Sequence, residues 1–368
     1  MDEVVRFHCS SGTTGKPICI PNTISDVEVW KNGVMRCLAM YGIRAGDVLQ
    51  VSYGYGLFTG GAGLHGGSHK VGCLTLPMSS GNTERQIQFM MDLNSTILCC
   101  TPSYAAYMAE SLKEQGYTPD QIPLKAGIFG AEAWTNEMRR QIEETLGIKA
   151  YDIYGLTETT GPGVAFECSE QTGMHINEDH FLAEIVSPET LEPITDEYGE
   201  LVITTLTKEG LPMIRYRTKD ITKINYEPCK CGRTSARMEK IRGRSDDMLI
   251  IRGVNVFPSQ IESVLLNNPD IQPHYHINVD RINNLDVMEI VVELSPSVSI
   301  DEIAHVEEIR KKLGFTSLQY ARLDDIIEAI NVCGRHKVNG DSVPKGADDI
   351  YDYNLYVGGT MLGRGLTL

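Results

Sequence analysis

A short stretch near the start of the chain, FHCSSGTTGKP at residues 7–17, places hydroxyl groups and one cation on a loop that contains glycine. It is not a Walker A loop, because Gly12 and Gly15 are only three residues apart and Pro17 stands where the Mg²⁺-binding hydroxyl would be. Such a loop can bind a polyphosphate chain through several weak contacts. On composition alone, the alternative is a polar turn between two strands. The polar side chains concerned are Ser10, Ser11, Thr13, Thr14 and Lys16.

A second group of residues has the types that bind metal. Cys168 and His175 are seven residues apart, and the stretch CKCG supplies Cys229 and Cys231. Three thiolates and an imidazole form a plausible tetrahedral zinc set, and four protein ligands would make that zinc structural. The alternative is four ordinary reduced side chains. All ten cysteines of the chain are expected to be reduced thiols or metal ligands rather than a disulfide framework.

Length and charge limit the classes of function. A chain of 368 residues can form two domains, or one large and one small domain. The net charge of −16 argues against nucleic acid or an anionic membrane surface as the main partner. No stretch reaches about 18 uncharged apolar residues, and the first residues lack the basic and apolar regions of a signal peptide. We therefore expect a cytoplasmic protein without a membrane partner.

The elements that must position these residues follow from apolar patterning. Short apolar runs such as VLQVSYGYG, CLTLP, STILCCTP and AGIFGAE are typical of buried strands, and RQIQFMMDL, SYAAYMAESLKEQG and NEMRRQIEETLG have helical spacing. This alternation predicts an α/β fold with largely parallel sheets. The stretch YGYGLFTGGAGLHGG at residues 53–67 has neither period and is predicted to be a loop.

The pattern changes twice along the chain. From about residue 179 the segments FLAEIVSPET, GELVITTLT and PMIRYRTKDITKI are typical of strands. From about residue 245 strands and a helical segment alternate. The predicted organisation is an α/β core at 1–178, a β-rich subdomain at 179–245 that completes the large domain, a small α+β domain at 246–313, and an atypical tail at 314–368 whose composition favours disorder.

Five further stretches, in order after the hydroxyl loop, give the sequence a specific resemblance. They are YGYGLFTGG, FGAEAW, YGLTETTG, RYRTKD and GRSDDMLIIRGVNVFPSQIE. Together the six motifs resemble the adenylate-forming superfamily, and within it the phenylacetate-CoA ligase family, over roughly residues 1–313. The resemblance implies an adenylate-forming enzyme fold, with a large N-terminal domain of parallel and mixed sheets and a small C-terminal α+β domain.

The resemblance assigns the phosphate end of a nucleotide site. Tyr154 and Gly155 follow a strand, so the next residues emerge at its carboxyl end, where open α/β sheets bind ligands. By resemblance Thr157 contacts the α-phosphate and Glu158 holds Mg²⁺, with Lys16 as the third catalytic residue. On its own, Glu158 would be taken for a solvated loop acid.

The adenosine end is assigned in the same way. Asp220 offers two acceptor oxygens to the ribose hydroxyls, and Arg244 is similar to its partner at the sugar. The wider superfamily usually has glycine where this chain has Lys219, which marks the aryl-CoA branch. Small residues at the adenine allow close approach, although Gly130 could also just end a strand. The residues resembling the adenine lining are Gly130, Ala131 and Glu132.

Further residues are assigned to the acid and to CoA. Aromatic side chains beside an adenylation site can wall an apolar, ring-sized pocket, so Tyr55 and Phe58 are proposed to contact the acid. Asp246 matches the family hinge on which the small domain swings, and Gly253 lies on the loop resembling the CoA passage.

The implied function is the ATP-dependent activation of an aromatic acid, with phenylacetate as the default, to an acyl-adenylate. The acyl group is then transferred to coenzyme A, with release of AMP and pyrophosphate, as in phenylacetate catabolism. A homodimer is a further expectation. The chain starts almost on the hydroxyl loop, and the family's C-terminal lysine does not align, with Lys337 and Lys345 the nearest candidates. A fragment that binds a nucleotide or acyl-adenylate without full ligase activity, and an interaction protein, are the alternatives.

Overall fold

The structure is a computed structural model that describes residues 3–10, 18–245, 249–251, 254–256, 258–282 and 285–294. Several predictions fall on residues outside this part of the chain. They concern Ser11, Thr13, Thr14, Lys16, Asp246, Gly253, Lys337, Lys345 and the tail at 314–368.

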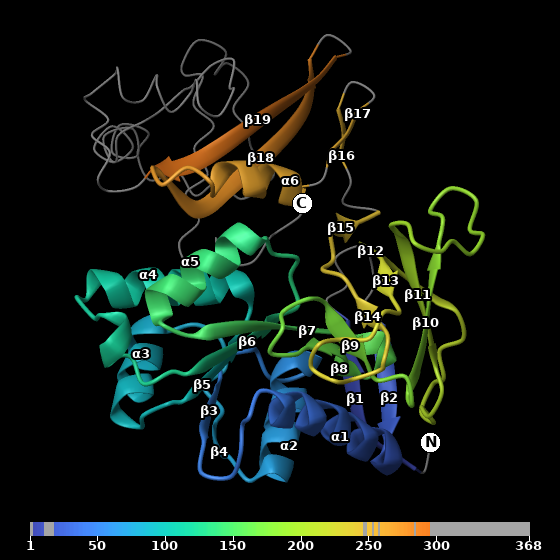
Figure 1. Ribbon diagram of the computed structural model, residues 1–368, viewed down its shortest axis with the longest axis horizontal. Coiled ribbons are helices and arrows are strands. Elements are labelled where there is room, and N and C mark those ends of the chain that lie inside the picture. Colours follow the sequence, from blue (N-terminus) through green and yellow to red (C-terminus); the bar gives the residue numbers. More distant parts are fainter. Residues whose placement is uncertain are drawn as a thin grey trace, which may run out of the picture. The chain divides into compact units, whose positions relative to one another are not determined.

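The core of the molecule is a mixed sheet of nine strands (Figure 1). From one edge to the other, the strands are β13 (Ile224–Asn225), β14 (Arg237–Met238), β9 (Met174–Ile176), β8 (Gly161–Glu167), β7 (Lys149–Leu156), β6 (Ala126–Gly130), β5 (Ile97–Cys100), β3 (Val48–Val51) and β4 (Leu74–Leu76). The strands from β7 to β4 pair in parallel, and the others pair antiparallel. The predicted α/β class is confirmed.

Helices cover both faces of this sheet. Alternate residues of a strand point to opposite faces, so Ile97 and Cys99 pack in the core with α1 and α2, and Leu98 and Cys100 pack in the core with α3, α4 and α5. The helices are α1 (Ile24–Met40), α2 (Thr59–Val71), α3 (Thr83–Asp92), α4 (Pro102–Glu114) and α5 (Asn136–Leu146), with 3₁₀ turns η1 (Pro119–Gln121) and η2 (Thr157–Thr159).

Side-chain caps set where the helices begin. At α1 the Thr23 hydroxyl accepts the N–H of Asp26 at 3.1 Å, and the Asp26 carboxylate accepts the N–H of Thr23 at 2.9 Å. This capping box satisfies two backbone donors that the helix itself cannot pair. Thr135 caps α5 through the N–H of Met138 in the same manner.

The prediction of a loop over residues 53–67 is wrong for its second half, because α2 begins at Thr59. Its glycines allow α2 to lie directly on α1: a Cβ added at Gly63 would be 2.6 Å from the Trp30 ring, and one at Gly67 would overlap Val34. Each glycine lowers intrinsic helix stability by about 1 kcal/mol relative to alanine. Close packing therefore stabilises this helix against its composition, which a pattern of apolar residues does not reveal.

A second sheet is antiparallel and contains β10 (Phe181–Val186), β11 (Gly199–Thr205), β12 (Tyr216–Thr222) and β15 (Gly243–Arg244). Its apolar face packs on the antiparallel half of the large sheet, where Tyr154 and Val164 meet Leu201 and Ile203 in one core. The smaller elements are the β1 (Val4–Cys9) and β2 (Cys19–Thr23) hairpin, the β16 (Leu249–Ile251) and β17 (Val254–Val256) pair, α6 (Pro258–Leu265), and the β18 (Ile271–Ile282) and β19 (Leu285–Leu294) pair.

The hairpin corrects one expectation about the cysteines. Cys9 and Cys19 are directly opposite in the β1–β2 register and form a disulfide, with their Cα atoms 4.1 Å apart. The expectation that the cysteines are reduced thiols is wrong for this pair. Their proximity depends on the hairpin register, which spacing in the sequence did not reveal. Within the described part of the chain the other cysteines are free.

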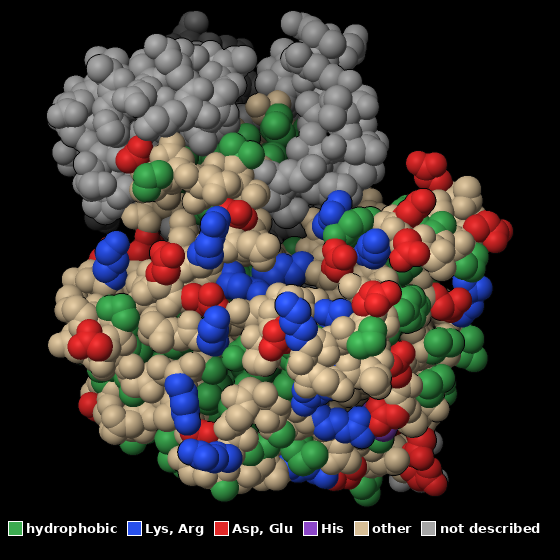
Figure 2. Space-filling view, in the orientation of Figure 1, with side chains coloured by type: hydrophobic (Ala, Val, Ile, Leu, Met, Phe, Trp, Pro, Cys, Tyr) green, Lys and Arg blue, Asp and Glu red, His purple; other side chains and the backbone are tan. Residues whose placement is uncertain are grey.

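Charged side chains of both signs are interspersed over the face drawn in Figure 2, and acidic side chains gather at the edge formed by the loops of the second sheet. Among the residues that the structure describes, none of the helices combines the length and the apolar character needed to cross a bilayer.

Candidate functional site

Three residues assigned to the adenosine, or next to it, lie together in the structure. The Tyr154 hydroxyl at the end of β7 donates to Asp220 Oδ2 at 2.6 Å, and Arg244 Nη1 is 3.7 Å from Asp220 Oδ1. Asp220 and Arg244 are also paired in the β12–β15 register. Asp220 is only 6% exposed, and burial together with this carboxylate raises the pKa of Tyr154. The carboxylate is therefore held in place from two sides.

The residues assigned to the phosphate end lie in η2, directly after β7. The hydroxyls of Thr157 and Thr59 are 3.4 Å apart, so Thr157 lies at the beginning of α2. Glu158 is half-buried and faces Tyr216; burial and this carboxylate raise the pKa of the tyrosine to about 12. A hydroxyl and a carboxylate thus lie just after the carboxyl end of β7, where open α/β sheets bind ligands.

Thr59 and Tyr216 were not predicted as parts of this site. Tyr216 lies in the stretch RYRTKD, four residues before Asp220, and an even spacing puts both on one face of a regular strand. Its place in this motif could have identified Tyr216, although the irregularity at Lys219 interrupts the alternation along β12. Thr59 had no such signal, because its place depends on the helix that was predicted to be a loop.

The segment assigned to the adenine leaves the end of β6 as a sharp bend. A side chain at Gly130 would overlap the backbone of the neighbouring strand, so only glycine fits there. Ala131 follows with a φ of 69°, in the left-handed region. Exposed Glu132 accepts hydrogen bonds from the N–H of Ser103 at 3.2 Å and from its hydroxyl at 3.0 Å. Gly130 is therefore required by strand packing.

Of the hydroxyl loop, the structure describes Ser10, whose Oγ accepts the N–H of Ile18 at 3.0 Å. The serine and the isoleucine thus pair at the end of the β1–β2 hairpin, where the loop begins and ends. Gly155 lies where β7 and β8 approach so closely that a Cβ would overlap Gly161. Both positions are fixed by backbone geometry.

The two aromatic residues assigned to the acid pocket lie between β3 and α2. The Tyr55 hydroxyl is 3.2 Å from Nδ1 of His65, and burial raises the pKa of this tyrosine. Phe58 directly precedes α2, is 37% exposed, and has its ring centroid 6.4 Å from that of Tyr53. Each ring therefore contacts a neighbour from its own stretch of chain.

Lys219 has a structural reason to be unusual. Its φ is 69°, a left-handed conformation in which a side chain costs about 1 kcal/mol or more and glycine does not. Its N–H donates to Glu200 and its carbonyl accepts from the N–H of Ser245 at 2.7 Å. The backbone shape therefore explains why glycine suits this position in the wider superfamily.

The four residues with metal-ligand chemistry converge. Their ligand atoms all lie within 4.8 Å of one another. Tetrahedral zinc with Zn–S bonds of about 2.3 Å places its sulfur ligands about 3.8 Å apart. The Sγ atoms of Cys168 and Cys229 are 3.7 Å apart, and Cys231 Sγ is 3.4 Å from Nε2 of His175. The donor set fits zinc in type, number and spacing.

The histidine of this group is oriented by a neighbour. Nδ1 of His175 is 3.0 Å from the Ser235 hydroxyl, so Nε2 faces the thiols. Burial lowers the pKa of His175, which favours the neutral imidazole that binds metal. Cys168 follows β8, His175 is in β9, and the other two lie between β13 and β14. A hollow of about 500 Å³ near the group is lined by His175 and Arg233 but by none of the predicted nucleotide residues.

Comparison with known proteins agrees with this geometry. Residues 1–207 match the AMP-binding enzyme family, and residues 253–319 match the AMP-binding enzyme C-terminal domain. A phenylacetate-coenzyme A ligase of Thermus thermophilus is 51% identical over 296 residues, which are 80% of this chain and 66% of the relative. That of Escherichia coli is 50% identical over 300 residues, 81% of this chain and 68% of the relative. The chain thus spans about two thirds of the length of these relatives.

Solved structures give the same result. A 2-hydroxyisobutyryl-CoA ligase in complex with 2-HIB-AMP has a TM-score of 0.79 at 28% identity, over 85% of this chain and 67% of that one. An anthranilate CoA ligase with anthranoyl-AMP has a TM-score of 0.65 at 20% identity and shares the fold. With the motifs, the converging site and half of the aligned residues in common, the chain belongs to the phenylacetate-CoA ligase family of AMP-binding enzymes.

Proposed function

We propose that this protein activates an aromatic carboxylic acid, with phenylacetate as the default, and transfers the acyl group to coenzyme A. The observation that carries the proposal is the convergence of Tyr154, Asp220 and Arg244 beside η2. Relatives about 50% identical to this chain are phenylacetate-coenzyme A ligases. The alternative is a chain that binds the nucleotide or acyl-adenylate without completing the reaction.

In the first step the acid's carboxylate oxygen attacks the α-phosphorus of ATP, and the bond to the bridging oxygen of pyrophosphate breaks. Thr157 donates to the α-phosphate, and Lys16 with the hydroxyl loop offsets the charge of the leaving group. Glu158 would hold Mg²⁺, which would supply further positive charge at the phosphates. In the second step the CoA thiolate attacks the acyl carbon and AMP leaves. Activation is needed because a free carboxylate is a poor electrophile.

Nucleotide binding tests the assignment of Asp220 to the ribose. Asp220→Asn leaves one acceptor oxygen where two are needed, and we expect AMP affinity to fall by about 1 to 3 kcal/mol, measured by calorimetry. Asp196→Asn makes the same chemical change at an exposed loop position and serves as the control. Unchanged AMP affinity in Asp220→Asn would remove the ribose assignment.

Pyrophosphate release tests the activity itself. We expect release from ATP and Mg²⁺ that depends on phenylacetate, and a raised KM for phenylacetate in Tyr55→Ala and Phe58→Ala. A protein that binds AMP but releases no pyrophosphate with any of a panel of aromatic acids would support the alternative. The hinge at Asp246 and the CoA passage at Gly253 remain proposals on residues outside the described part of the chain.

We also propose a structural zinc ion at the four converging ligands. Its support is the donor set and its tetrahedral spacing. Protein purified without added zinc should contain close to one zinc per chain, and Cys229→Ser should lose most of it. Cys73→Ser, a change at another buried thiol, should not. A zinc content far below one per chain in the unaltered protein would contradict the proposal.

The expected cytoplasmic location and the homodimer complete the proposed function. Cell fractionation tests the location, and light scattering during size-exclusion chromatography tests the assembly. A monomeric mass at micromolar concentration would remove the dimer.

A further inference from the structure

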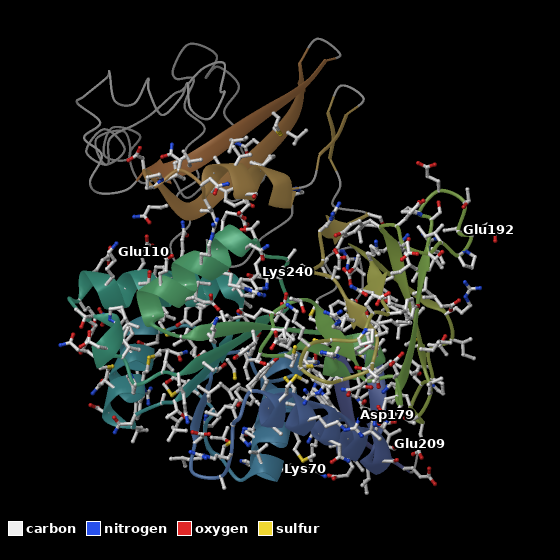
Figure 3. All side chains as sticks on the ribbon, viewed as in Figure 1. Lys70, Glu110, Asp179, Glu192, Glu209 and Lys240 are labelled. Atoms are coloured by element: carbon white, nitrogen blue, oxygen red, sulfur yellow. A yellow bond between two sulfur atoms is a disulfide. The ribbon has the colours of Figure 1, made fainter. Side chains whose placement is uncertain are left out.

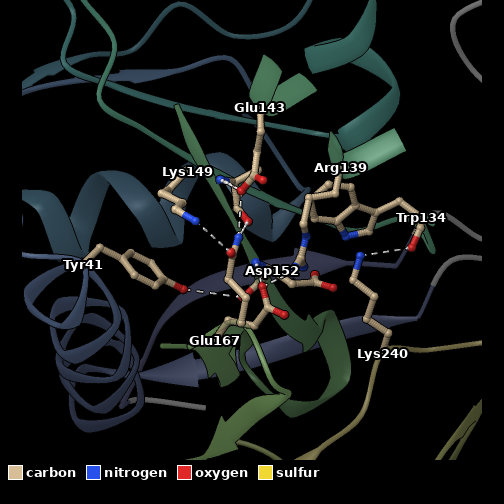
Figure 4. Close-up of polar contacts among 10 residues, drawn as sticks. Tyr41, Trp134, Arg139, Glu143, Lys149, Asp152, Glu167 and Lys240 are labelled. Carbon is tan, nitrogen blue, oxygen red and sulfur yellow. Dashed lines mark hydrogen bonds and ion pairs between the residues drawn. The ribbon is translucent and has the colours of Figure 1, made fainter. Parts of the chain in front are cut away.

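A lysine from the second half of the chain is inserted against the indole of Trp134. Lys240 Nζ is 3.9 Å from the centroid of the Trp134 ring, and it donates to the backbone carbonyl of the same residue at 3.4 Å (Figure 4). Arg139 Cζ is 4.9 Å from that ring. Trp134 is 4% exposed, so both cation–π contacts are largely shielded from water, where they are strongest.

Two buried acidic residues lie beside these cations, and one of them pairs with Arg139. Glu167 Oε2 accepts from Arg139 Nη2 at 2.7 Å and from the N–H of Asp152 at 2.8 Å. Glu167 is 1% exposed and Asp152 is 7% exposed. We call Trp134, Arg139, Asp152, Glu167 and Lys240 the indole cluster. Lys240 is half-buried, and Figure 3 shows it near the middle of the view, between the elements of the two sheets.

The position of the indole cluster connects two assigned parts of the nucleotide site. Trp134 ends the stretch FGAEAW, four residues after Gly130. Lys240 is four residues before Arg244, which pairs with Asp220. One side chain therefore reaches from the segment assigned to the ribose to the segment assigned to the adenine.

The charge of Lys240 also indicates a role other than filling space. A buried charge network is seldom more stable than apolar side chains of similar volume, so a methionine would fill this space at least as well. What a methionine cannot do is donate to the Trp134 carbonyl or attract the indole face. The lysine thus joins the two segments through one hydrogen bond and one cation–π contact.

We propose that Lys240 is a positioning residue for nucleotide binding, which holds the adenine segment Gly130–Trp134 in place relative to Asp220 and Arg244 through the ring and carbonyl of Trp134. This inference rests on the proposed function, because it concerns the same nucleotide site. Lys240 does not need to touch the nucleotide in order to act.

The test uses the full chain and separates binding of the nucleotide from other steps. Lys240→Met keeps the length of the side chain and removes its charge. We expect the KM for ATP and the Kd for AMP to rise about 3- to 30-fold, with the KM for phenylacetate unchanged. Lys240→Arg restores a cation that binds aromatic faces and should recover most of the affinity. Lys149→Met, at an exposed lysine of β7, is the matched control and should bind like the unaltered protein.

Two outcomes overturn the inference. If Lys240→Met lowers the melting temperature but leaves the KM for ATP and the Kd for AMP unchanged, the residue is only structural. If Lys240→Met does not fold, the test uses Trp134→Phe, whose aromatic face attracts the lysine less strongly. Unchanged AMP affinity in Trp134→Phe would also contradict the inference. Failure of the proposed function is distinguishable in the unaltered protein: AMP binding without pyrophosphate release removes the ligase activity but leaves the inference testable through the Kd for AMP, whereas the absence of AMP binding removes both.

Discussion

The two helical layers on the central sheet are built in opposite ways. On one face, α2 lies on α1 because Gly63 and Gly67 remove side-chain volume. On the other face, α5 contributes Arg139 to a buried network of charges. The first layer depends on close approach at glycine, and the second adds a buried ion pair to its apolar core. Since buried charges add little stability over apolar packing, their presence on one layer indicates a demand for position, beside the segment assigned to the adenine.

The largest expected loss of stability follows the removal of one buried charge. Arg139→Met leaves Glu167 buried without its ion-pair partner, and we expect the free energy of unfolding to fall by about 3 to 5 kcal/mol in urea titrations. Arg140→Met, at the neighbouring residue whose side chain is 61% exposed, is the control and should change it by less than about 0.5 kcal/mol. Equal losses in the two variants would show that the second layer does not depend on its buried pair.

The glycine layer should respond to added volume. Gly67→Ala puts a methyl group into Val34, and we expect a loss of about 1 to 3 kcal/mol in unfolding free energy although alanine favours helices. At Gly66 the added carbon would meet only the flexible side chain of Lys31, so Gly66→Ala should be neutral or gain up to about 1 kcal/mol. If both substitutions stabilised the protein, the position of α2 would not depend on its close packing against α1.

The smallest expected effect is a dependence of the unfolding free energy on pH, which arises from Asp152. Burial, and then the neighbouring Glu167, raise the pKa of Asp152 to about 7, while Lys240 and Arg139 act in the opposite direction. An unfolded aspartate ionises near pH 4, so the folded protein binds the additional proton between about pH 4 and 7. The contribution of Asp152 to stability therefore falls as the pH rises through this window.

Asp152→Asn removes that titration, so its stability relative to the unaltered protein should improve from pH 4.5 to pH 7.5 in urea titrations. Asp196→Asn, at an exposed position, should show no such trend. Parallel curves for Asp152→Asn and the unaltered protein would contradict the raised pKa.

Local sequence patterns predicted much of the fold. They failed where an element is determined by contacts with residues distant in the sequence. The runs that became β5 and β6 were recognisable because buried parallel strands are continuously apolar. The α2 helix was missed because its stability comes from Trp30 and Val34 on another helix. The disulfide was missed because Cys9 and Cys19 meet only through hairpin register.

The candidate site divides in the same way. Asp220 and Arg244 were identified from motifs, and the structure brings them together. The contact of Lys240 with Trp134 could not be foreseen, because more than 100 residues separate them and neither belongs to a periodic pattern that points to the other.

Because α2 packs on α1 at positions that have no side chain, few substitutions at those positions are possible when the protein is redesigned. A carbon added at Gly63 or Gly67 must move α2, and with it the aromatic stretch at residues 53–58 that leads into it. A mutant library intended to change acid preference should therefore keep Gly63 and Gly67 constant. Diversity belongs in the residues before the helix and at positions such as Gly66, where a new side chain displaces only the flexible side chain of Lys31.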